Sequence, residues 1–324
     1  MSNKVICKIC PRECNLGNNQ VGFCKARKNL NGQIAPVIYG YNTGLAIDPI
    51  EKKPLYHFHP NKPILSFGTL GCNVGCRFCQ NWTMTKEINN RNLYQAFPQD
   101  IVNIAQTHAC NMVAFTYNEP IIFFEYAINT AKLCHENQIK TVAVTSGYIH
   151  DKARAEFFDN MDAVNIDLKG FSEEFYRKNC LAHLQPVLDS ILYVKNETNC
   201  HLEITTLLIE GENDSTEMLE KECKWILENL GTNVPLHFSA FHPSYKLMNK
   251  PRTSIETLLK AYNIAQKIGL NYVYLGNISN INTSTTYCKN CHTPLIIRDG
   301  FKTLENKLIN GSCPICKTIC DGIF

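Results

Sequence analysis

The chain has 324 residues, 44% of them hydrophobic, with a formal net charge of +3 and a pI of about 8.1. This length suits one large core domain with small appendages, and so mild a charge does not support nucleic-acid or anionic-membrane binding. No apolar run approaches the roughly 18 residues of a membrane span, and the N-terminus lacks the apolar segment of a signal peptide. We therefore expect a cytoplasmic protein that has no membrane partner and keeps its thiols reduced.

The N-terminal region, residues 1–60, is predicted to be a cysteine-rich module with a lead-in to the core. Its cysteines follow the pattern C-x2-C-x3-C-x9-C and are Cys7, Cys10, Cys14 and Cys24. Four thiolates can close a metal site completely, which favours structural zinc. An auxiliary [4Fe-4S] cluster that relays electrons is the alternative, and the spacing does not separate the two.

Residues 61–280 alternate short apolar or β-branched runs with longer segments of helical periodicity, which is typical of repeated βα units. Seven runs are predicted to be strands, at 64–70, 112–117, 141–146, 163–169, 201–209, 236–241 and 272–276. A helix is expected after each strand, so the core should be α/β with a mainly parallel sheet. Periodicity does not distinguish an open sheet from one that curls into a barrel.

Two of the expected helices have recognisable ends. Pro98 fits the first turn of a helix, where its missing N–H removes no hydrogen bond. Ser215 suits the N-terminal end of a helix over 215–230, and Gly231 suits its C-terminal end. One face of this helix is apolar and is predicted to pack on the core; it carries Met218, Leu219, Cys223, Ile226 and Leu227.

Three cysteines follow the first predicted strand, in the stretch "GCNVGCRFCQNW". They are Cys72, Cys76 and Cys79, and the next cysteine in the chain is Cys110. A cubane cluster normally takes one thiolate for each of its four irons, so three thiols leave one iron open to an external ligand. Sites that perform chemistry keep a position free in this way. A zinc site completed by a distant histidine, or part of a ferredoxin motif, is the alternative.

Polar residues end the second and third predicted strands, in "YNEP" and "TSGY". They are Asn118 and Glu119 in the first motif, and Thr145, Ser146 and Gly147 in the second. The C-terminal ends of parallel strands meet at the edge where α/β folds place their active sites, so a ligand such as a ribose or carboxylate is expected there. The alternatives are that Glu119 caps the following helix and that "TSGY" is an ordinary turn.

Ionisable residues mark the fourth and sixth predicted strands. Asp167 and Lys169 lie two apart and therefore on one face of the fourth strand. Because buried charges cost free energy unless they are paired or used, we expect either ligand binding or a plain salt bridge. His237 and His242 are expected at the rim near the end of the sixth strand, as substrate-site residues or as ordinary rim histidines.

The last region, residues 281–324, is predicted to be a zinc ribbon. A Ser/Thr/Asn-rich stretch at 277–286 separates it from the core. Two C-x2-C pairs follow, and four thiolates make a closed tetrahedral site; the cysteines are Cys288, Cys291, Cys313 and Cys316. Iron or a redox dithiol is the alternative, and Cys320 is spare.

The combined motifs resemble the radical S-adenosylmethionine (radical SAM) superfamily. They run from "CKICPRECNLGNNQVGFCK" through the three central cysteines, "YNEP", "TSGY", "NIDLKG", "HFSAFHP" and "YLGN" to "CPIC". This set, which covers almost the whole chain, is similar to the radical SAM member of the AmmeMemoRadiSam system, a relative of the pyruvate formate-lyase activating enzymes. The resemblance implies a partial (β/α)6-type, TIM-like barrel with small cysteine-rich metal modules at both ends.

The resemblance also implies a cofactor chemistry. A [4Fe-4S] cluster on the three central cysteines would chelate the amino and carboxylate groups of SAM. One-electron reduction would then release methionine and a 5′-deoxyadenosyl radical that abstracts a hydrogen atom. Glu119 matches the acid that receives the SAM amino group, although Tyr117 and Asn118 replace the family's paired glycines. The predicted cofactor-binding residues are Phe78, Asn118, Glu119, Thr145, Ser146, Gly147, Asp167, Lys169 and His242.

The partners implied are a one-electron donor such as flavodoxin or ferredoxin, together with Memo-like and AMMECR1-like proteins. The substrate is left open between the glycyl backbone of a partner enzyme, as in the activases, and another protein or a small molecule. Two other interpretations predict different behaviour. A non-catalytic zinc-binding interaction protein would be colourless, and a redox or hydrolytic metalloenzyme would not depend on SAM.

Overall fold

The structure is a computed structural model that describes residues 4–87 and 92–324. An eight-stranded sheet forms its centre, in the order β14-β13-β12-β11-β10-β9-β7-β6. β6 pairs antiparallel with β7, whereas all other neighbouring pairs in this sheet are parallel. The strands are β6 (Leu45–Pro49), β7 (Pro63–Phe67), β9 (Met112–Phe115), β10 (Lys140–Thr145), β11 (Ala163–Asp167), β12 (His201–Leu208), β13 (Leu236–Ala240) and β14 (Val273–Gly276).

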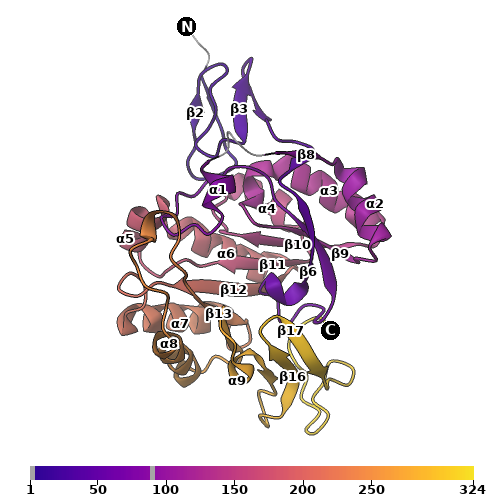
Figure 1. The fold of residues 1–324 in the computed structure, drawn as a ribbon, viewed down its shortest axis with the longest axis vertical. Helices are drawn as coiled ribbons and strands as arrows, with labels where there is room; N and C mark the ends of the chain where they lie inside the picture. Colours follow the sequence, from indigo (N-terminus) through magenta and orange to yellow (C-terminus); the bar gives the residue numbers. More distant parts are fainter. Residues whose placement is uncertain (1–3, 88–91) are drawn as a thin grey trace.

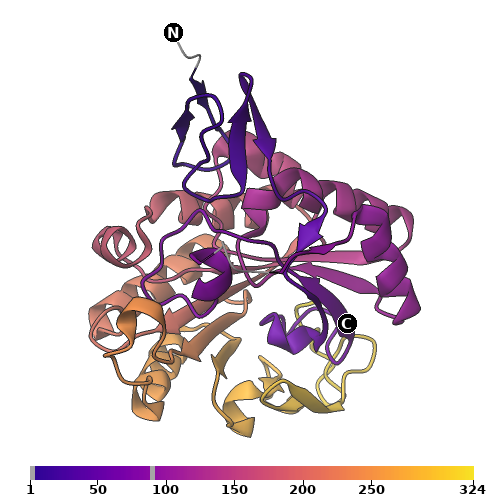
Figure 2. The same cartoon turned by 45° about the horizontal axis from the view of Figure 1, so that its top comes forward.

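A long helix lies in each of the six connections between successive parallel strands. Parallel strands that follow one another in the chain are also neighbours in the sheet, so each βα unit adds one strand to the same edge. The twisted sheet curls, and the helices lie on its outside (Figures 1 and 2). The predicted partial (β/α)6-type barrel is therefore confirmed. The helices are α2 (Pro98–Thr107), α3 (Phe124–Glu136), α4 (Asp151–Phe158), α6 (Gln185–Glu197), α7 (Thr216–Leu230) and α8 (Ile255–Ile268).

Short helical segments lie in the loops around the barrel. Three are α-helical: α1 (Trp82–Thr85), α5 (Glu173–Phe175) and α9 (Ile281–Ser284). Three are 3-10 helices: η1 (Ile50–Lys52), η3 (Pro120–Phe123) and η5 (Tyr245–Leu247). A π-helical turn, η4 (Tyr176–Cys180), follows α5 directly. No helix among the described residues is long and apolar enough to cross a membrane.

All seven predicted strands are present, and α7 has the predicted ends. The Ser215 side chain accepts the Met218 N–H at 3.2 Å, and Gly231 ends the helix with φ +81°. Several strands end two or three residues before their predicted limits, because the chain turns there into loops. After β9, for example, Tyr117 has φ +67°, which no strand allows.

The two cysteine-rich regions lie at opposite ends of the molecule (Figure 1). The N-terminal one is built from two-stranded antiparallel sheets, β1 (Val5–Ile6) with β2 (Asn15–Leu16) and β3 (Arg27–Leu30) with β4 (Gln33–Pro36). A third small sheet joins β5 (Tyr41–Asn42) to β8 (Tyr94–Gln95). The C-terminal region is a three-stranded sheet of β15 (Thr286–Tyr287), β16 (Pro294–Asp299) and β17 (Lys302–Asn306).

The C-terminal region packs against β14 and the segment that leads from β6 to β7. Tyr56, Tyr274 and Ile296 belong to one buried apolar cluster there, and Phe58 forms a β-bridge with Ile323. Figure 2 shows the C-terminal strands on the side of the barrel where the sheet does not close. They therefore form a wall of the barrel as well as carrying the C-terminal cysteines.

Candidate functional site

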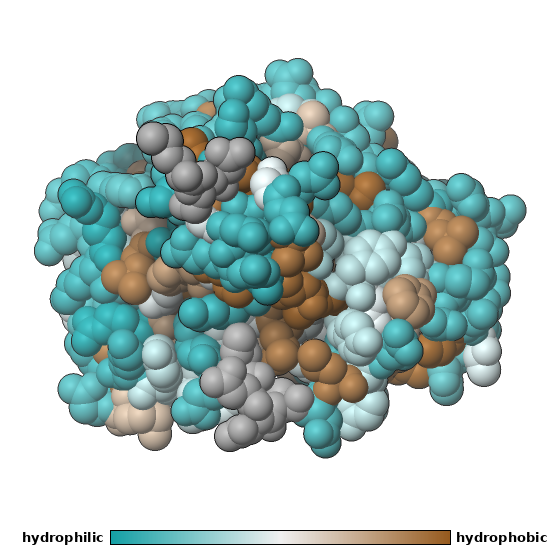
Figure 3. Space-filling model, turned by 90° about the horizontal axis from the view of Figure 1, so that it is seen from above, coloured by the Kyte–Doolittle hydropathy of each residue, from teal (hydrophilic) through white to brown (hydrophobic). Residues whose placement is uncertain are grey.

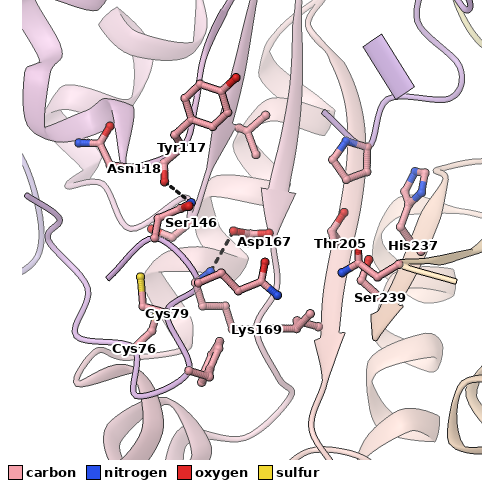
Figure 4. Close-up of a pocket in the computed structure, with 18 of the residues that line it drawn as sticks. Cys76, Cys79, Tyr117, Asn118, Ser146, Asp167, Lys169, Thr205, His237 and Ser239 are labelled. Atoms are coloured by element: carbon pink, nitrogen blue, oxygen red, sulfur yellow. Dashed lines mark hydrogen bonds and ion pairs between the residues drawn. The ribbon is translucent and has the colours of Figure 1, made fainter. Parts of the chain in front are cut away.

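A cavity of about 290 Å³ lies inside the barrel toward the C-terminal ends of the parallel strands. Figure 3 views the molecule from the end that carries the N-terminal strands, where apolar residues surround a hollow with hydrophilic residues at its margin. Figure 4 shows Cys76 and Cys79 on one side of the cavity and Thr205, His237 and Ser239 on the other, with Asp167 and Lys169 between them. Cys72, Asn118, Glu119 and Ser146 also line it.

The loop that carries the three cysteines is fixed at its start by Asn118. The Asn118 amide donates to the Thr69 hydroxyl at 2.9 Å and to the Gly71 carbonyl at 3.1 Å, and it accepts the Thr69 N–H at 2.9 Å. This predicted cofactor-binding residue therefore lines the cavity but uses its side chain to position the cysteine loop.

The second half of the loop packs on the π-helical turn η4. The Gly75 N–H donates to the Cys180 carbonyl at 2.6 Å, and the Arg77 N–H donates to the Asn179 carbonyl at 2.8 Å. Phe78, only 4% exposed, lies 6.0 Å from the ring of Phe175 between centroids. The cysteine loop is thus held on both sides, so the three thiols face one cavity from a rigid support.

Glu119 is buried beside the cavity, and its carboxylate accepts hydrogen bonds from two segments of the chain. Its carboxylate accepts from the Thr145 hydroxyl at 2.5 Å and from the N–H and hydroxyl of Ser146 at 2.8 and 2.5 Å. It also caps η3 by accepting the Ile121 N–H at 3.3 Å, so the capping role expected as the alternative is present. Burial raises the pKa of Glu119 above its ordinary value, although these donors oppose the shift.

Asp167 and Lys169 form an ion pair of 2.9 Å, and both line the cavity. Burial by itself would lower the pKa of Lys169, but Asp167 and the neighbouring thiols hold it well above its ordinary value. The salt bridge expected as an alternative is thus present, and it stands where a ligand in the cavity would meet it.

Three other predicted residues do not line this cavity. Thr145 donates its hydroxyl to the Glu119 carboxylate. Gly147 forms a left-handed turn with φ +64°, and His242 is half-buried in the loop after β13. The expectation that His237 sits at the same rim as His242 is wrong. His237 is the second residue of β13 and therefore lies deep in the barrel, where its Nε2 is 2.6 Å from Glu203.

Glu203 organises the inner end of the cavity. Its buried carboxylate accepts the backbone N–H groups of Tyr56 and His57 at 3.0 and 2.7 Å and contacts the rings of His201 and His237 at 3.0 and 2.6 Å. Burial raises the pKa of Glu203, but these partners outweigh burial and bring it well below its ordinary value. The inner wall is therefore an ordered polar network.

Sequence reasoning missed several residues that line the cavity. Thr205 and Ser239 point inward from β12 and β13, while Glu51 and Phe301 come from the lead-in and the C-terminal region. The two strand positions follow the inward alternation of their strands and could have been found from it. Glu51 and Phe301 carry no such local signal.

Some of these atoms have no protein partner. Thr205 Oγ1 and Glu51 Oε2 are buried and unpaired within the described part of the chain. Buried polar atoms are nearly always hydrogen-bonded, so their presence beside three thiols suits a cavity that takes polar ligands. This donor set fits a three-thiolate [4Fe-4S] cluster with SAM and a substrate next to it.

The C-terminal cysteines form a compact site. The sulfur atoms of Cys288, Cys291, Cys313 and Cys316 all lie within 4.8 Å of one another, and the Cys288–Cys316 and Cys291–Cys313 pairs are 3.5 and 3.6 Å apart. With metal–sulfur bonds of about 2.3 Å, a tetrahedral ion holds its thiolates roughly 3.8 Å apart. The predicted four-cysteine cluster is confirmed, and zinc stays the prediction for its metal.

Comparison with known proteins assigns the family. A profile described as the Radical SAM superfamily matches residues 67–226, which include the three central cysteines. The uncharacterized protein MJ0808 of Methanocaldococcus jannaschii is 40% identical over 317 residues, which is 97% of this chain and 94% of that relative. The chain belongs to the radical SAM superfamily.

More distant relatives of this radical SAM protein include activating enzymes. The 4-hydroxyphenylacetate decarboxylase activating enzyme of Clostridium scatologenes is 27% identical over 118 residues, covering 36% of this chain and 38% of the relative. That of Clostridioides difficile strain 630 is 24% identical over 196 residues, covering 56% and 58%. A radical SAM methyltransferase structure from Sphaerobacter thermophilus matches 68% of both chains at 16% identity with a TM-score of 0.52, which supports the fold.

Proposed function

We propose that this protein cleaves SAM reductively at a [4Fe-4S] cluster held by Cys72, Cys76 and Cys79 and uses the resulting 5′-deoxyadenosyl radical to abstract hydrogen from a substrate in the barrel. The observation that carries the proposal is the meeting of three thiols, a buried carboxylate and a lysine–aspartate pair around one cavity. In this account the cluster supplies the electron that breaks the sulfonium bond, and the chain binds and shields the reactants.

The residues near the thiols are suited to hold an amino acid. Lys169 offers a cation for a carboxylate, and Glu119 and Asp167 offer acceptors for an ammonium group. Because Thr145 and Ser146 fix the Glu119 carboxylate, its orientation is set before a ligand binds, which reduces the entropy lost on binding.

The residues opposite the thiols are suited to hold the substrate. Thr205, Ser239 and His237 project into the cavity from β12 and β13. The unpaired oxygens of Thr205 and Glu51 favour a substrate with hydrogen-bond donors. We infer a polar substrate group that reaches the barrel interior and leaves no room for bulk water beside the radical.

The test is 5′-deoxyadenosine release from SAM by anaerobically reconstituted protein with a strong one-electron reductant. Cys76→Ala is the inactive variant, and Cys200→Ala is the matched control because Cys200 lies outside the cavity. We expect product from the wild type and the control but not from Cys76→Ala. Protein that holds its cluster and forms no product would contradict the proposal. A colourless protein with zinc at all three cysteine groups would instead favour a non-catalytic interaction protein.

A second candidate, activation of a glycyl-radical enzyme, is favoured by the similarity to the two activating enzymes described above. In that case the substrate would be a glycine backbone, and a loop of the partner would have to enter the barrel. A glycyl-radical electron paramagnetic resonance (EPR) signal in a candidate partner, dependent on SAM and this protein, is the expected result. Its absence while 5′-deoxyadenosine forms with another substrate would exclude this role.

For partners we propose a flavodoxin- or ferredoxin-type electron donor and Memo-like and AMMECR1-like proteins. Co-purification of tagged protein from its native host, under anaerobic conditions, tests binding of the Memo-like and AMMECR1-like proteins. Recovery of neither protein, with the donor present, would contradict that part of the proposal.

A further inference from the structure

The four N-terminal cysteines surround a second, enclosed cavity. Cys7, Cys10, Cys14 and Cys24 all line it, together with the apolar side chains of Ile9, Leu16, Ile121 and Ile122. A Cβ atom on Gly22 would lie 3.7 and 3.8 Å from the sulfur atoms of Cys14 and Cys24. The thiols thus face one small shared space.

The spacing of these thiols differs from that of the C-terminal site. The C-terminal sulfurs lie within 4.8 Å of one another, as a single tetrahedral ion requires. Among the described residues, neither the N-terminal cysteines nor the three central ones contain a group of three that meets this limit. Thiolates around a cube of four irons stand farther apart than those around a single ion, because each thiolate binds a different iron. The N-terminal set therefore differs in spacing from the C-terminal set, as the three central cysteines also do.

An independent observation comes from Arg27, which lines the same cavity. Its side chain is 5% exposed, and its terminal nitrogens bind Glu125 at 2.7 and 2.6 Å. Its Nε is buried and has no partner among the described residues. A buried N–H donor beside four thiols suits an anionic sulfur-rich ligand, because N–H groups hydrogen-bond to thiolate and sulfide.

The N-terminal cavity also touches the central cysteine loop. A Cβ atom on Gly71 would lie 1.9 Å from the Cys24 carbonyl oxygen, so the backbones of the two cysteine regions are in direct contact. Arg12 donates from the N-terminal region to the carbonyl of Asn73, which is in the central cysteine loop, and to that of Leu181, which packs against this loop at Gly75. The two cysteine sites therefore share a wall.

We propose that Cys7, Cys10, Cys14 and Cys24 bind an iron–sulfur cluster of the [4Fe-4S] class and not zinc. This differs from the structural zinc that the sequence pattern favoured. The proposal concerns a separate site and does not rest on the proposed function of the barrel.

The test uses the full chain with Cys72→Ala, Cys76→Ala and Cys79→Ala, so that the central thiols are removed. Anaerobically purified and reconstituted protein is analysed for iron, sulfide and zinc and by Mössbauer spectroscopy. We expect about four irons and four sulfides per chain from the N-terminal site, with about one zinc at the C-terminal site. About two zincs and no iron in the folded protein would overturn the proposal.

Further variants separate the site from misfolding. Adding Cys10→Ser and Cys14→Ser should remove the remaining iron, whereas adding Cys200→Ser should leave it in place. Zinc retained at the C-terminal site, together with an unchanged circular dichroism spectrum, shows that each variant is folded. Iron that persists without Cys10 and Cys14, or a folded triple variant without metal at the N-terminal site, would also overturn the proposal.

Discussion

At the scale of single residues, Gly71 links the two cysteine sites. It has φ +91°, and any side chain there would collide with the Cys24 carbonyl. The same residue receives a hydrogen bond from Asn118 on its carbonyl. Glycine is therefore required here for two reasons. Without a Cβ atom it can adopt the positive φ, and it leaves room for the contact between the two regions.

Gly71→Ala should lower the iron content at Cys72, Cys76 and Cys79 and reduce the melting temperature. Gly32→Ala is the matched control, because Gly32 also has φ +91° but has no atom within 4 Å of its Cβ position. The control should lose only roughly 1 kcal/mol of stability, which is the cost of placing alanine in a left-handed backbone conformation. Iron analysis and thermal unfolding measure both effects, and equal losses in the two variants would contradict the role given to the Cys24 contact.

Glu222 gives a pH-dependent prediction. It is fully buried on α7 with the Thr206 hydroxyl at 2.5 Å, and burial raises its pKa to about 8. The unfolded carboxyl loses its proton at lower pH, so this group favours the folded state fully in acid and progressively less as pH rises through about 8. Glu222→Gln should therefore stabilise the protein increasingly between pH 5 and 8, measured by thermal unfolding. A melting-temperature difference that is constant over this range would contradict the assignment.

At the scale of elements, the sequence predicts the repeating pattern better than the polar lining of the barrel. Strand positions and the ends of α7 follow from local periodicity, caps and glycine. The inward direction of Thr205 follows from the two-residue period of its strand, but the contribution of Phe301 depends on long-range packing. Helical periodicity places Glu222 on the buried face of α7, but its contact with Thr206 of β12 depends on long-range packing.

The cysteine loop and η4 form a packed pair that can be tested. A Cβ atom on Gly75 would lie 2.7 to 3.0 Å from side-chain atoms of Leu181, which has φ +49°. Gly75→Ala should separate the two elements and lower iron binding at the central cysteines. Adding Leu181→Gly removes the colliding atoms and relaxes the left-handed backbone, so the double variant should regain iron. Failure of that rescue, with the protein folded, would contradict the packing described.

At the scale of the whole molecule, the C-terminal region completes the barrel. Arg298 is fully buried, donates to the Tyr56 carbonyl at 2.6 Å and to the Thr286 hydroxyl at 2.8 Å, and lies 3.5 Å from Glu51. This one side chain joins the C-terminal region to the segment between β6 and β7 that lines the cavity. The C-terminal region is therefore expected to influence both the stability of the protein and the shape of the cavity.

Arg298→Met should destabilise the protein by about 3 kcal/mol, because it leaves Glu51 buried without its counter-charge. Arg298→Met with Glu51→Gln should recover part of this loss. Chemical unfolding under anaerobic conditions measures both variants. If Glu51→Gln adds its own destabilisation in full to that of Arg298→Met, the two residues are not coupled and the prediction is wrong.

The EPR spectrum of the reduced protein, recorded with and without SAM, tests whether the central cysteines hold a cluster with one iron open to SAM. Cys10→Ser with Cys14→Ser simplifies the spectrum by removing the proposed N-terminal cluster. We predict a cluster signal that changes when SAM is added and that is absent in protein also carrying Cys76→Ala. A signal from the central cysteines that excess SAM leaves unchanged would show that SAM does not bind the open iron.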